Sequence, residues 1–201
     1  MIKNLVFDMG NVLIKWTPDL IMDYYNINDE PERSTLKRVM FASIEWALLD
    51  WGKLTADEAE KRFQARLPKE YWPHIHNAMY WFDHVHNVDG MVDFIKRKKE
   101  QGYGIYLLSN APAFVYDYKA SVPGLEYFDG IIISGCVGLV KPMPEIYQLL
   151  FNKYNLNPAE CLFVDDLTLN CAGALLQGMQ AIVFKGDPQD VEDYLNELNS
   201  K

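Results

Sequence analysis

The chain has 201 residues, 49% of them hydrophobic and 23% charged, which suits one large domain, or a core with a smaller appended domain, and excludes intrinsic disorder. Its formal net charge of −9 makes nucleic acid an unfavourable partner, because an acidic chain repels phosphate backbones. No apolar run reaches the roughly 18 residues of a membrane span and no signal-peptide pattern is present, so we expect a cytoplasmic protein with no membrane partner.

Five short apolar runs have the pattern of strands that are buried on both faces of a parallel sheet. They cover residues 5–7, 105–108, 131–133, 162–164 and 181–184. Helix patterns separate the later runs, at residues 91–101, 145–154 and 169–177. The first and third of these end before a glycine, and the second follows a proline, as helix boundaries often do. This alternation predicts an α/β fold with a doubly wound, Rossmann-like parallel sheet.

The stretch between the first two strands contains no strand pattern and is rich in helix formers and aromatic residues. We expect a helical insertion of about four helices, one of which starts at a capping box formed by Thr55 and Glu58. An insertion at this point lies beyond the carboxyl end of the sheet, where open α/β sheets bind ligands. The predicted domains are therefore a core of residues 1–15 and 87–201 and a helical cap of residues 16–86.

Tryptophans in this insertion have two interpretations. Trp16, Trp46 and Trp51 could line a substrate pocket, since aromatic rings stack on sugars. Packing in the core of the insertion itself is the favoured interpretation.

Polar residues with phosphate chemistry follow four of the five strands. They are Asp8 after the first strand, Ser109 and Asn110 after the second, Lys141 shortly after the third, and Asp165 and Asp166 after the fourth. Each alone would more often be a turn, a helix cap or a surface residue. Because the carboxyl ends of parallel strands meet at one crevice, their joint occurrence predicts a shared site.

The chemistry of these residue types suits phosphoryl transfer. A carboxylate such as Asp8 can attack phosphorus to give a covalent aspartyl-phosphate. Ser109 and Asn110 can donate hydrogen bonds to phosphoryl oxygens, and Lys141 can neutralise the developing charge. The three aspartates provide hard oxygen ligands for Mg²⁺.

Four sequence motifs resemble those of the haloacid dehalogenase superfamily, and together they span nearly the whole chain. They read VFDMGNV at residues 6–12, LLSN at 107–110, GLVKPMPEIY at 138–147 and FVDD at 163–166. The insertion stands where that family has its C1-type helical cap. The GNV form of the first motif and the segment DWGKLT at residues 50–55 resemble the α-D-glucose-1-phosphate phosphatase-like subgroup.

The resemblance implies a role for each matched residue. Asp8 would be the nucleophile and a metal ligand, and the backbone carbonyl of Gly10 would be a second metal ligand. Lys141 would bind the phosphoryl group and hold the Asp8 carboxylate in place. Asp166 would be the direct Mg²⁺ ligand and Asp165 a more indirect partner, although these two could be reversed.

Gly10 is the one departure from the phosphatase pattern. Phosphatases of this superfamily usually carry a second aspartate two residues after the nucleophile, where it acts as general acid and base. General acid–base catalysis contributes roughly 10² to 10⁴ in rate. Another residue could supply the proton, with Asp50 and Glu45 as candidates in the insertion, although no spacing argument places them. An anomeric leaving group, as in glucose 1-phosphate, would need the acid less.

The sequence thus predicts an Mg²⁺-dependent phosphatase that hydrolyses a small phosphorylated metabolite, such as a sugar phosphate. One alternative is a metal-independent 2-haloacid dehalogenase, which the acidic pair Asp165 and Asp166 disfavours. The other alternative is a degenerate binding or regulatory protein, which only Gly10 supports. The sequence leaves open whether the protein is a monomer or a homodimer.

Overall fold

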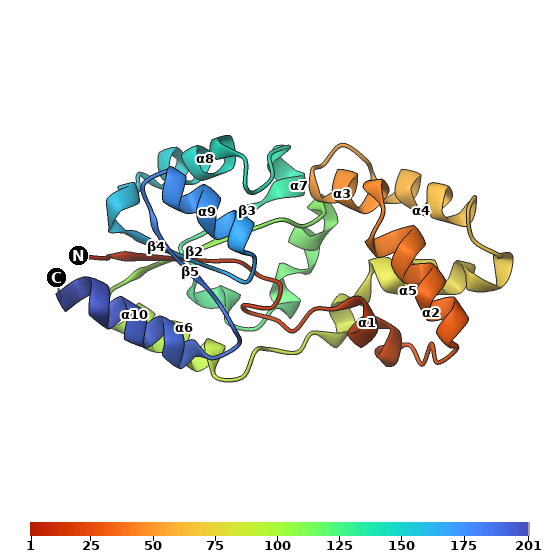
Figure 1. Cartoon of the computed structure of the whole chain (residues 1–201), viewed down its shortest axis with the longest axis horizontal. Helices are drawn as coiled ribbons and strands as arrows, with labels where there is room; N and C mark the ends of the chain where they lie inside the picture. The colour runs from red at the N-terminus through yellow and green to blue at the C-terminus, as the bar shows by residue number, and fades with distance from the viewer. Residues whose placement is uncertain (201) are drawn as a thin grey trace.

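We describe residues 1–200 of the chain, without the side chain of Asp83, from a computed structural model. A five-stranded parallel sheet with the strand order β3-β2-β1-β4-β5 forms the centre of one half of the molecule (Figure 1). The strands are β1 (Asn4–Phe7), β2 (Gly104–Ser109), β3 (Gly130–Ile133), β4 (Cys161–Asp165) and β5 (Gln180–Val183). All five coincide with the predicted apolar runs to within a residue or two.

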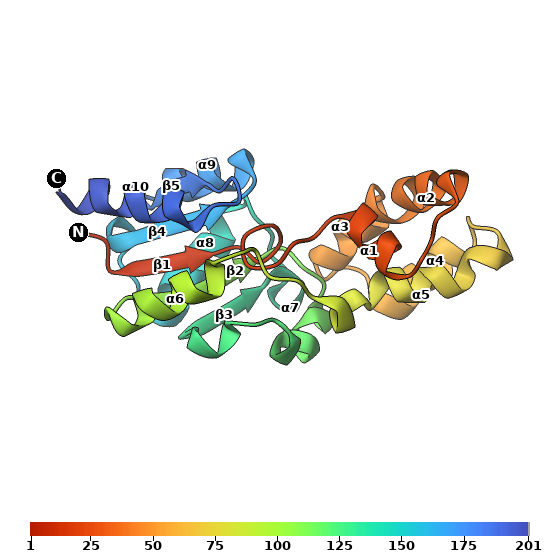
Figure 2. The same cartoon turned by 90° about the horizontal axis from the view of Figure 1, so that it is seen from below.

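Helices cover both faces of this sheet. They are α6 (Met91–Glu100) and α10 (Pro188–Ser200) on one face, and α8 (Pro144–Tyr154) and α9 (Thr168–Leu176) on the other (Figures 1 and 2). Successive residues of β1 alternate between the two faces: Leu5 and Phe7 pack in the cluster that contains Phe94, whereas Val6 packs with Ile146. The predicted doubly wound α/β fold is confirmed.

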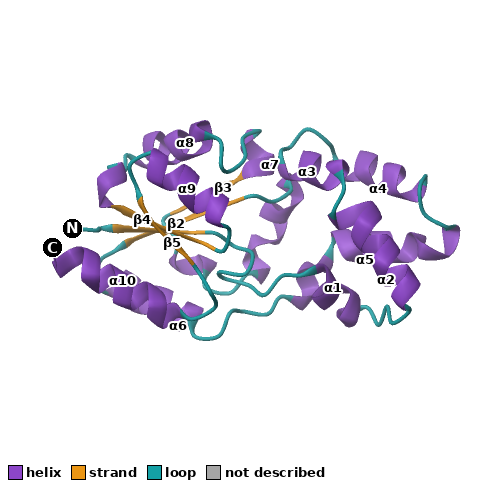
Figure 3. Ribbon diagram, viewed as in Figure 1, coloured by secondary structure: helices purple, strands orange, loops and turns teal. Residues whose placement is uncertain are grey.

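The insertion between β1 and β2 consists of helices and loops (Figure 3). Its α-helices are α1 (Pro18–Tyr24), α2 (Glu30–Leu36), α3 (Ile44–Asp50), α4 (Ala56–Gln64) and α5 (Trp72–Met79). These are five helices among the described residues, against the expected four, because the region splits into short helices of seven to nine residues. The predicted capping box is present, since Glu58 N–H donates to Thr55 Oγ1 and Thr55 N–H donates to Glu58 Oε2.

Shorter elements complete the chain. They are η1 (Lys37–Phe41), a π-helical turn, the 3₁₀ segments η2 (Lys69–Tyr71), η3 (Trp81–His84), η4 (Ala113–Ser121), η5 (Leu125–Tyr127) and η6 (Pro158–Glu160), and the single-turn helix α7 (Ser134–Val137). Every helix in the described part of the chain is too short or too polar to cross a lipid bilayer.

The two segments that join the insertion to the sheet lie side by side. Lys15 N–H donates to His86 O at 2.7 Å, and Val88 N–H donates to Leu13 O at 2.9 Å. Ile14 and Asn87 form an isolated antiparallel bridge between them. The insertion lies beyond the carboxyl ends of the strands (Figure 2), so it faces the edge of the sheet at which the predicted polar residues are located.

Candidate active site

Asp8 follows the last residue of β1 and lies at the base of a cavity. Its backbone N–H donates to Val164 O at 2.9 Å, which continues the β1–β4 ladder and fixes the residue at the sheet edge. The side chain is buried. Apart from the ammonium group of Lys141, which lies 2.9 Å from Asp8 Oδ1, this buried oxygen has no hydrogen-bond partner among the described residues.

Lys141 is buried between two carboxylates. Its Nζ lies 2.9 Å from Asp8 Oδ1 and donates to Asp165 Oδ2 at 2.7 Å. Burial lowers the pKa of Lys141, but the two carboxylates raise it more, so the net direction is upward and the ammonium form is favoured. The site therefore has a fixed positive charge beside Asp8.

Asn110 holds the backbone of this lysine. Its side-chain Nδ2 donates to Lys141 O at 3.0 Å, and its Oδ1 accepts from Lys141 N–H at 2.8 Å. Asn110 nevertheless lines the cavity and keeps one amide hydrogen that these bonds do not use. Ser109 lines the same cavity, and no described hydrogen bond uses its hydroxyl group.

The side chains of Asp8, Asp165 and Asp166 form an acidic cluster in which one oxygen from each lies within 4.8 Å of the others. Asp165 is fully buried, and its oxygens accept hydrogen bonds from Leu167 N–H at 2.8 Å and from Asn170 Nδ2 at 3.0 and 3.1 Å, as well as from Lys141. Asp166 is half-buried, and its Oδ2 accepts from Asn11 Nδ2 at 3.1 Å. Asp166 is thus the more available oxygen ligand of the pair.

The charge balance of this cluster fits a divalent cation. Burial raises the pKa of Asp8 to about 6, because the stabilising effect of Lys141 does not fully offset the desolvation and the nearby Asp165. Burial also raises the pKa of Asp166, and Asp165 adds to this rise, while the hydrogen bond from Asn11 opposes it. The cluster has three carboxylates and only one ammonium group among the described residues, and Asp8 Oδ1 has no donor other than that group. These carboxylates are a suitable set of hard oxygen ligands for a divalent cation.

Gly10 lies in the loop that follows Asp8 and lines the cavity. A Cβ atom built there would meet only Trp16 Cβ, at 4.0 Å, so the position has space for a side chain but supplies none. The structure thus places all seven predicted residues at one end of the sheet. Asp8, Gly10, Ser109, Asn110 and Asp166 line the cavity, whereas Lys141 and Asp165 are buried beneath it.

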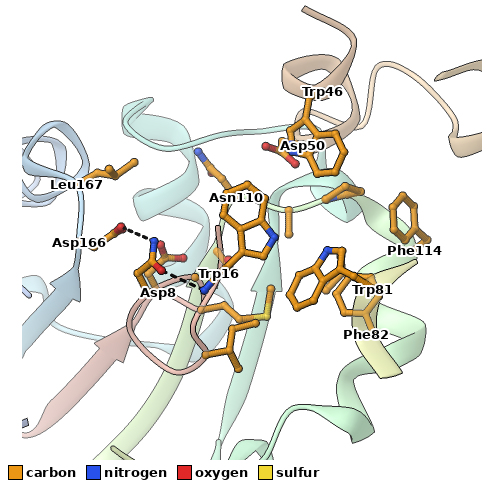
Figure 4. Close-up of a pocket in the computed structure, with 18 of the residues that line it drawn as sticks. Asp8, Trp16, Trp46, Asp50, Trp81, Phe82, Asn110, Phe114, Asp166 and Leu167 are labelled. Atoms are coloured by element: carbon orange, nitrogen blue, oxygen red, sulfur yellow. Dashed lines mark hydrogen bonds between the residues drawn. The ribbon is translucent and has the colours of Figure 1, made fainter. Parts of the chain in front are cut away.

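The cavity has a volume of about 330 Å³ and is lined by residues of both the sheet edge and the insertion. Trp16, Trp46, Trp81, Phe82 and Phe114 form its aromatic walls (Figure 4). The favoured interpretation of the tryptophans as packing residues is therefore incomplete: Trp16 and Trp46 line the cavity as well as packing in the core. Trp51 does not line it, and instead donates from Nε1 to Gly138 O of the core.

Sequence reasoning missed several residues of this site. Asn11 lies inside the first motif and Asn170 follows the fourth, but the motifs predict no role for either of them. In the structure, Asn11 Nδ2 donates to Asp166 and Asn170 Nδ2 donates to Asp165. Trp81 and Phe114 reach the cavity from segments far apart in the sequence. Asp50, one of the two acidic candidates in the insertion, lines the cavity, and no sequence spacing could have selected it.

The comparison with protein families matches residues 2–178 to the haloacid dehalogenase-like hydrolases. The D-ribitol-5-phosphate phosphatase of Bacteroides thetaiotaomicron is 30% identical over 179 residues, which cover 85% of this chain and 85% of that protein. The Escherichia coli 5-amino-6-(5-phospho-D-ribitylamino)uracil phosphatase YigB is 30% identical over 165 residues, 81% of this chain and 63% of that protein.

Among solved structures, the complex of the Bacteroides thetaiotaomicron HAD family enzyme bt-2542 with magnesium and inorganic phosphate has a TM-score of 0.70 with this chain. The two are 21% identical, and the match covers 92% of this chain and 96% of that one. This likeness shows that the two chains share a fold.

Proposed function

The chain belongs to the haloacid dehalogenase-like hydrolases, and on this premise we propose that it is an Mg²⁺-dependent phosphatase that hydrolyses a small phosphorylated metabolite through Asp8. The observation that carries the proposal is the burial of Lys141 between Asp8 and Asp165, with Asp166 beside them at the edge of the cavity. In this arrangement the Lys141 ammonium group would neutralise negative charge on a bound phosphoryl group, while the Asp8 carboxylate faces the phosphorus atom.

In the first step, an Asp8 oxygen attacks phosphorus and the bond to the leaving-group oxygen breaks. The Lys141 ammonium group neutralises charge on the phosphoryl oxygens, and the Ser109 hydroxyl and the remaining Asn110 amide hydrogen donate to them. Water then attacks the aspartyl-phosphate, which releases inorganic phosphate and restores the Asp8 carboxylate. Asp165 keeps Lys141 in position throughout.

A magnesium ion held by Asp8, the carbonyl of Gly10 and Asp166 would neutralise phosphoryl charge and orient the phosphoryl group for attack. Asp165 is the more indirect partner in this assignment, because Lys141, Asn170 and Leu167 N–H already occupy its oxygens.

The cavity and the relatives support a proposal for the substrate class. A cavity of about 330 Å³ holds a small metabolite, and aromatic walls suit a carbon skeleton that presents C–H groups to the rings. A relative that covers most of this chain acts on a polyol phosphate. We therefore propose a sugar or polyol phosphate, with D-ribitol 5-phosphate and glucose 1-phosphate as first candidates, and we assign residues 16–86 as a substrate-selecting cap on a core of residues 1–15 and 87–201.

A phosphate-release screen over phosphorylated metabolites, with Mg²⁺ and with EDTA, tests this function. We expect release from a sugar or polyol phosphate that EDTA abolishes. Chloride release from 2-chloropropionate that persists in EDTA, with no phosphate release, would instead identify a dehalogenase. Binding of phosphorylated metabolites without turnover of any of them would identify a degenerate binding protein.

A further inference from the structure

The leaving group of an alkyl phosphate is a poor one unless it receives a proton as its bond to phosphorus breaks. The residue that gives this proton must line the cavity and must not already be committed to the phosphoryl group. Among the described residues that line the cavity, the ionisable side chains are Asp8, Asp50 and Asp166. Asp8 is the proposed nucleophile and Asp166 a proposed metal ligand, which leaves Asp50.

Asp50 enters the cavity from the insertion. It is the last residue of α3, and Figure 4 shows its carboxylate beside Trp46, on a different wall of the cavity from Asp8. With the phosphoryl group of a substrate bound at Asp8, its leaving group would extend into the rest of the cavity, which Asp50 also lines. The position is therefore suitable for protonating the alcohol oxygen rather than for attacking phosphorus.

Three consecutive residues fix this part of the insertion to the core. The backbone carbonyl of Asp50 accepts from Ser134 Oγ, and Trp51 Nε1 donates to Gly138 O at 3.0 Å. Gly52 has a φ of +69° and packs so closely that a Cβ atom there would lie 2.3 Å from Gly135 O. These contacts hold the Asp50 backbone on the core, in reach of the same cavity as Asp8.

The environment of Asp50 suits a group that both gives and takes a proton. Burial raises the pKa of its carboxyl to about 7, the negative charge of Asp8 contributes to the rise, and Lys141 opposes it. A general acid works best when its pKa is close to the working pH.

Glu45, the other acidic candidate in the insertion, does not line this cavity. Its carboxylate is buried against Arg66, with Arg66 Nη2 2.7 Å from Glu45 Oε2. Although burial acts against ionisation, a backbone hydrogen bond and Arg66 lower the pKa of Glu45, so this group stays ionised and is committed to its partner.

We propose that Asp50 is the general acid and base of this enzyme, supplied by the insertion across the cavity from Asp8. This inference rests on the proposed phosphatase function. In the first step, Asp8 bonds to phosphorus, the leaving oxygen departs with the bonding electron pair, and it takes the proton of the Asp50 carboxyl group to become an alcohol. In the second step, the Asp50 carboxylate takes a proton from water as the water oxygen bonds to phosphorus, and the bond from phosphorus to the Asp8 oxygen breaks.

The test compares wild type, Asp50→Asn and the control Glu45→Gln on two phosphate esters. One is an alkyl phosphate, D-ribitol 5-phosphate or the best substrate of the screen, and the other is 4-nitrophenyl phosphate, whose leaving group needs no proton. The kcat/KM value reports the steps up to release of the leaving group, so it isolates the acid step. Thermal melts check that each variant is folded.

We expect Asp50→Asn to lower kcat/KM for the alkyl phosphate by about 10² to 10⁴, and for 4-nitrophenyl phosphate by less than about tenfold. Because the variant also lacks the base of the second step, it should release one nitrophenolate per enzyme in a rapid burst and then turn over slowly. Glu45→Gln should show neither the selective loss nor the burst.

Two results would overturn the assignment of Asp50: an equal loss on both esters, or no loss on either, in an enzyme whose wild type hydrolyses both. Absence of hydrolysis of either ester by the wild type would instead refute the proposed function itself.

Discussion

Asp8→Asn should abolish turnover and at the same time stabilise the metal-free protein. The physical reason is that the Asp8 carboxylate is buried, and its pKa is raised from 3.8 to about 6 by that burial, even though Lys141 lies 2.9 Å away. A tenfold change in an ionisation constant is worth about 1.4 kcal/mol, so holding the ionised form in the folded state costs about 3 kcal/mol above pH 6. Asparagine keeps the shape of the side chain without the charge.

The sign of this effect depends on pH. When the pKa of an acid is higher in the folded than in the unfolded protein, the unfolding free energy of the protein falls as pH rises through the interval between the two pKa values. The difference in unfolding free energy between Asp8→Asn and wild type should therefore be near zero below pH 4, and should grow to about 3 kcal/mol by pH 7. For a chain of this size, that corresponds to a rise of roughly 6 to 12 °C in melting temperature.

The assay is urea and thermal unfolding in EDTA at pH 4, 5.5 and 7.5, with Asp117→Asn at an exposed carboxylate as the matched control. Addition of Mg²⁺ at pH 7.5 should reduce the difference in unfolding free energy between the variant and the wild type, because the cation binds the folded wild type more tightly. The variant could instead be as stable as the wild type, or less stable, at pH 7.5 in EDTA. Either result would show that the charge of the buried Asp8 carboxylate does not destabilise the folded protein.

Three further perturbations test the buried ion pair, the docking of the insertion and the role of Asp50. Lys141→Met should lose activity and about 3–5 kcal/mol of unfolding free energy, because it leaves two buried carboxylates without their cation; a urea titration that gives less than 1 kcal/mol would contradict the buried pairing. Gly52→Ala should displace the loop that carries Asp50 and lower kcat/KM for the alkyl phosphate at least tenfold. Gly102 has a similar positive φ but no neighbour within 4 Å, so the control Gly102→Ala should change only stability. Equal kcat/KM values in the two variants would contradict the inference that this loop must pack against the core. Because a general acid must be protonated to act, kcat/KM for the alkyl phosphate should fall as pH rises through about 7. This fall in kcat/KM should be absent in Asp50→Asn. If the variant still shows the fall, the titrating group is another residue.

The core of the fold was predictable because it depends on local patterns. Continuous apolar runs such as residues 162–164 mark strands that are buried on both faces, and the proline before residue 145 marks the start of α8. The gathering of Asp8, Lys141 and the acidic pair followed from one rule, that parallel strands end at the same edge. Their roles as nucleophile, phosphoryl ligand and metal ligands stay predictions.

The walls of the cavity could not be predicted from the sequence, because they depend on how the insertion docks on the core. Asp50 reaches the cavity through contacts between residues more than 80 positions apart, such as Trp51 with Gly138 and Asp50 with Ser134. Local sequence patterns do not predict such long-range contacts. The same reason explains why Trp16 and Trp46 line the cavity and Trp51 does not, although all three are tryptophans of one segment.

In the proposed mechanism, the phosphoryl group passes through a covalent bond to Asp8. The most direct test of this mechanism is acid quenching of the wild type during turnover of a ³²P-labelled substrate found in the screen, followed by peptide mass spectrometry. We expect a phosphoryl group on the peptide that contains Asp8, formed within the first turnover, labile to hydroxylamine and absent from Asp8→Asn. Rapid phosphate release without any label on that peptide, or release that persists in Asp8→Asn, would contradict this mechanism.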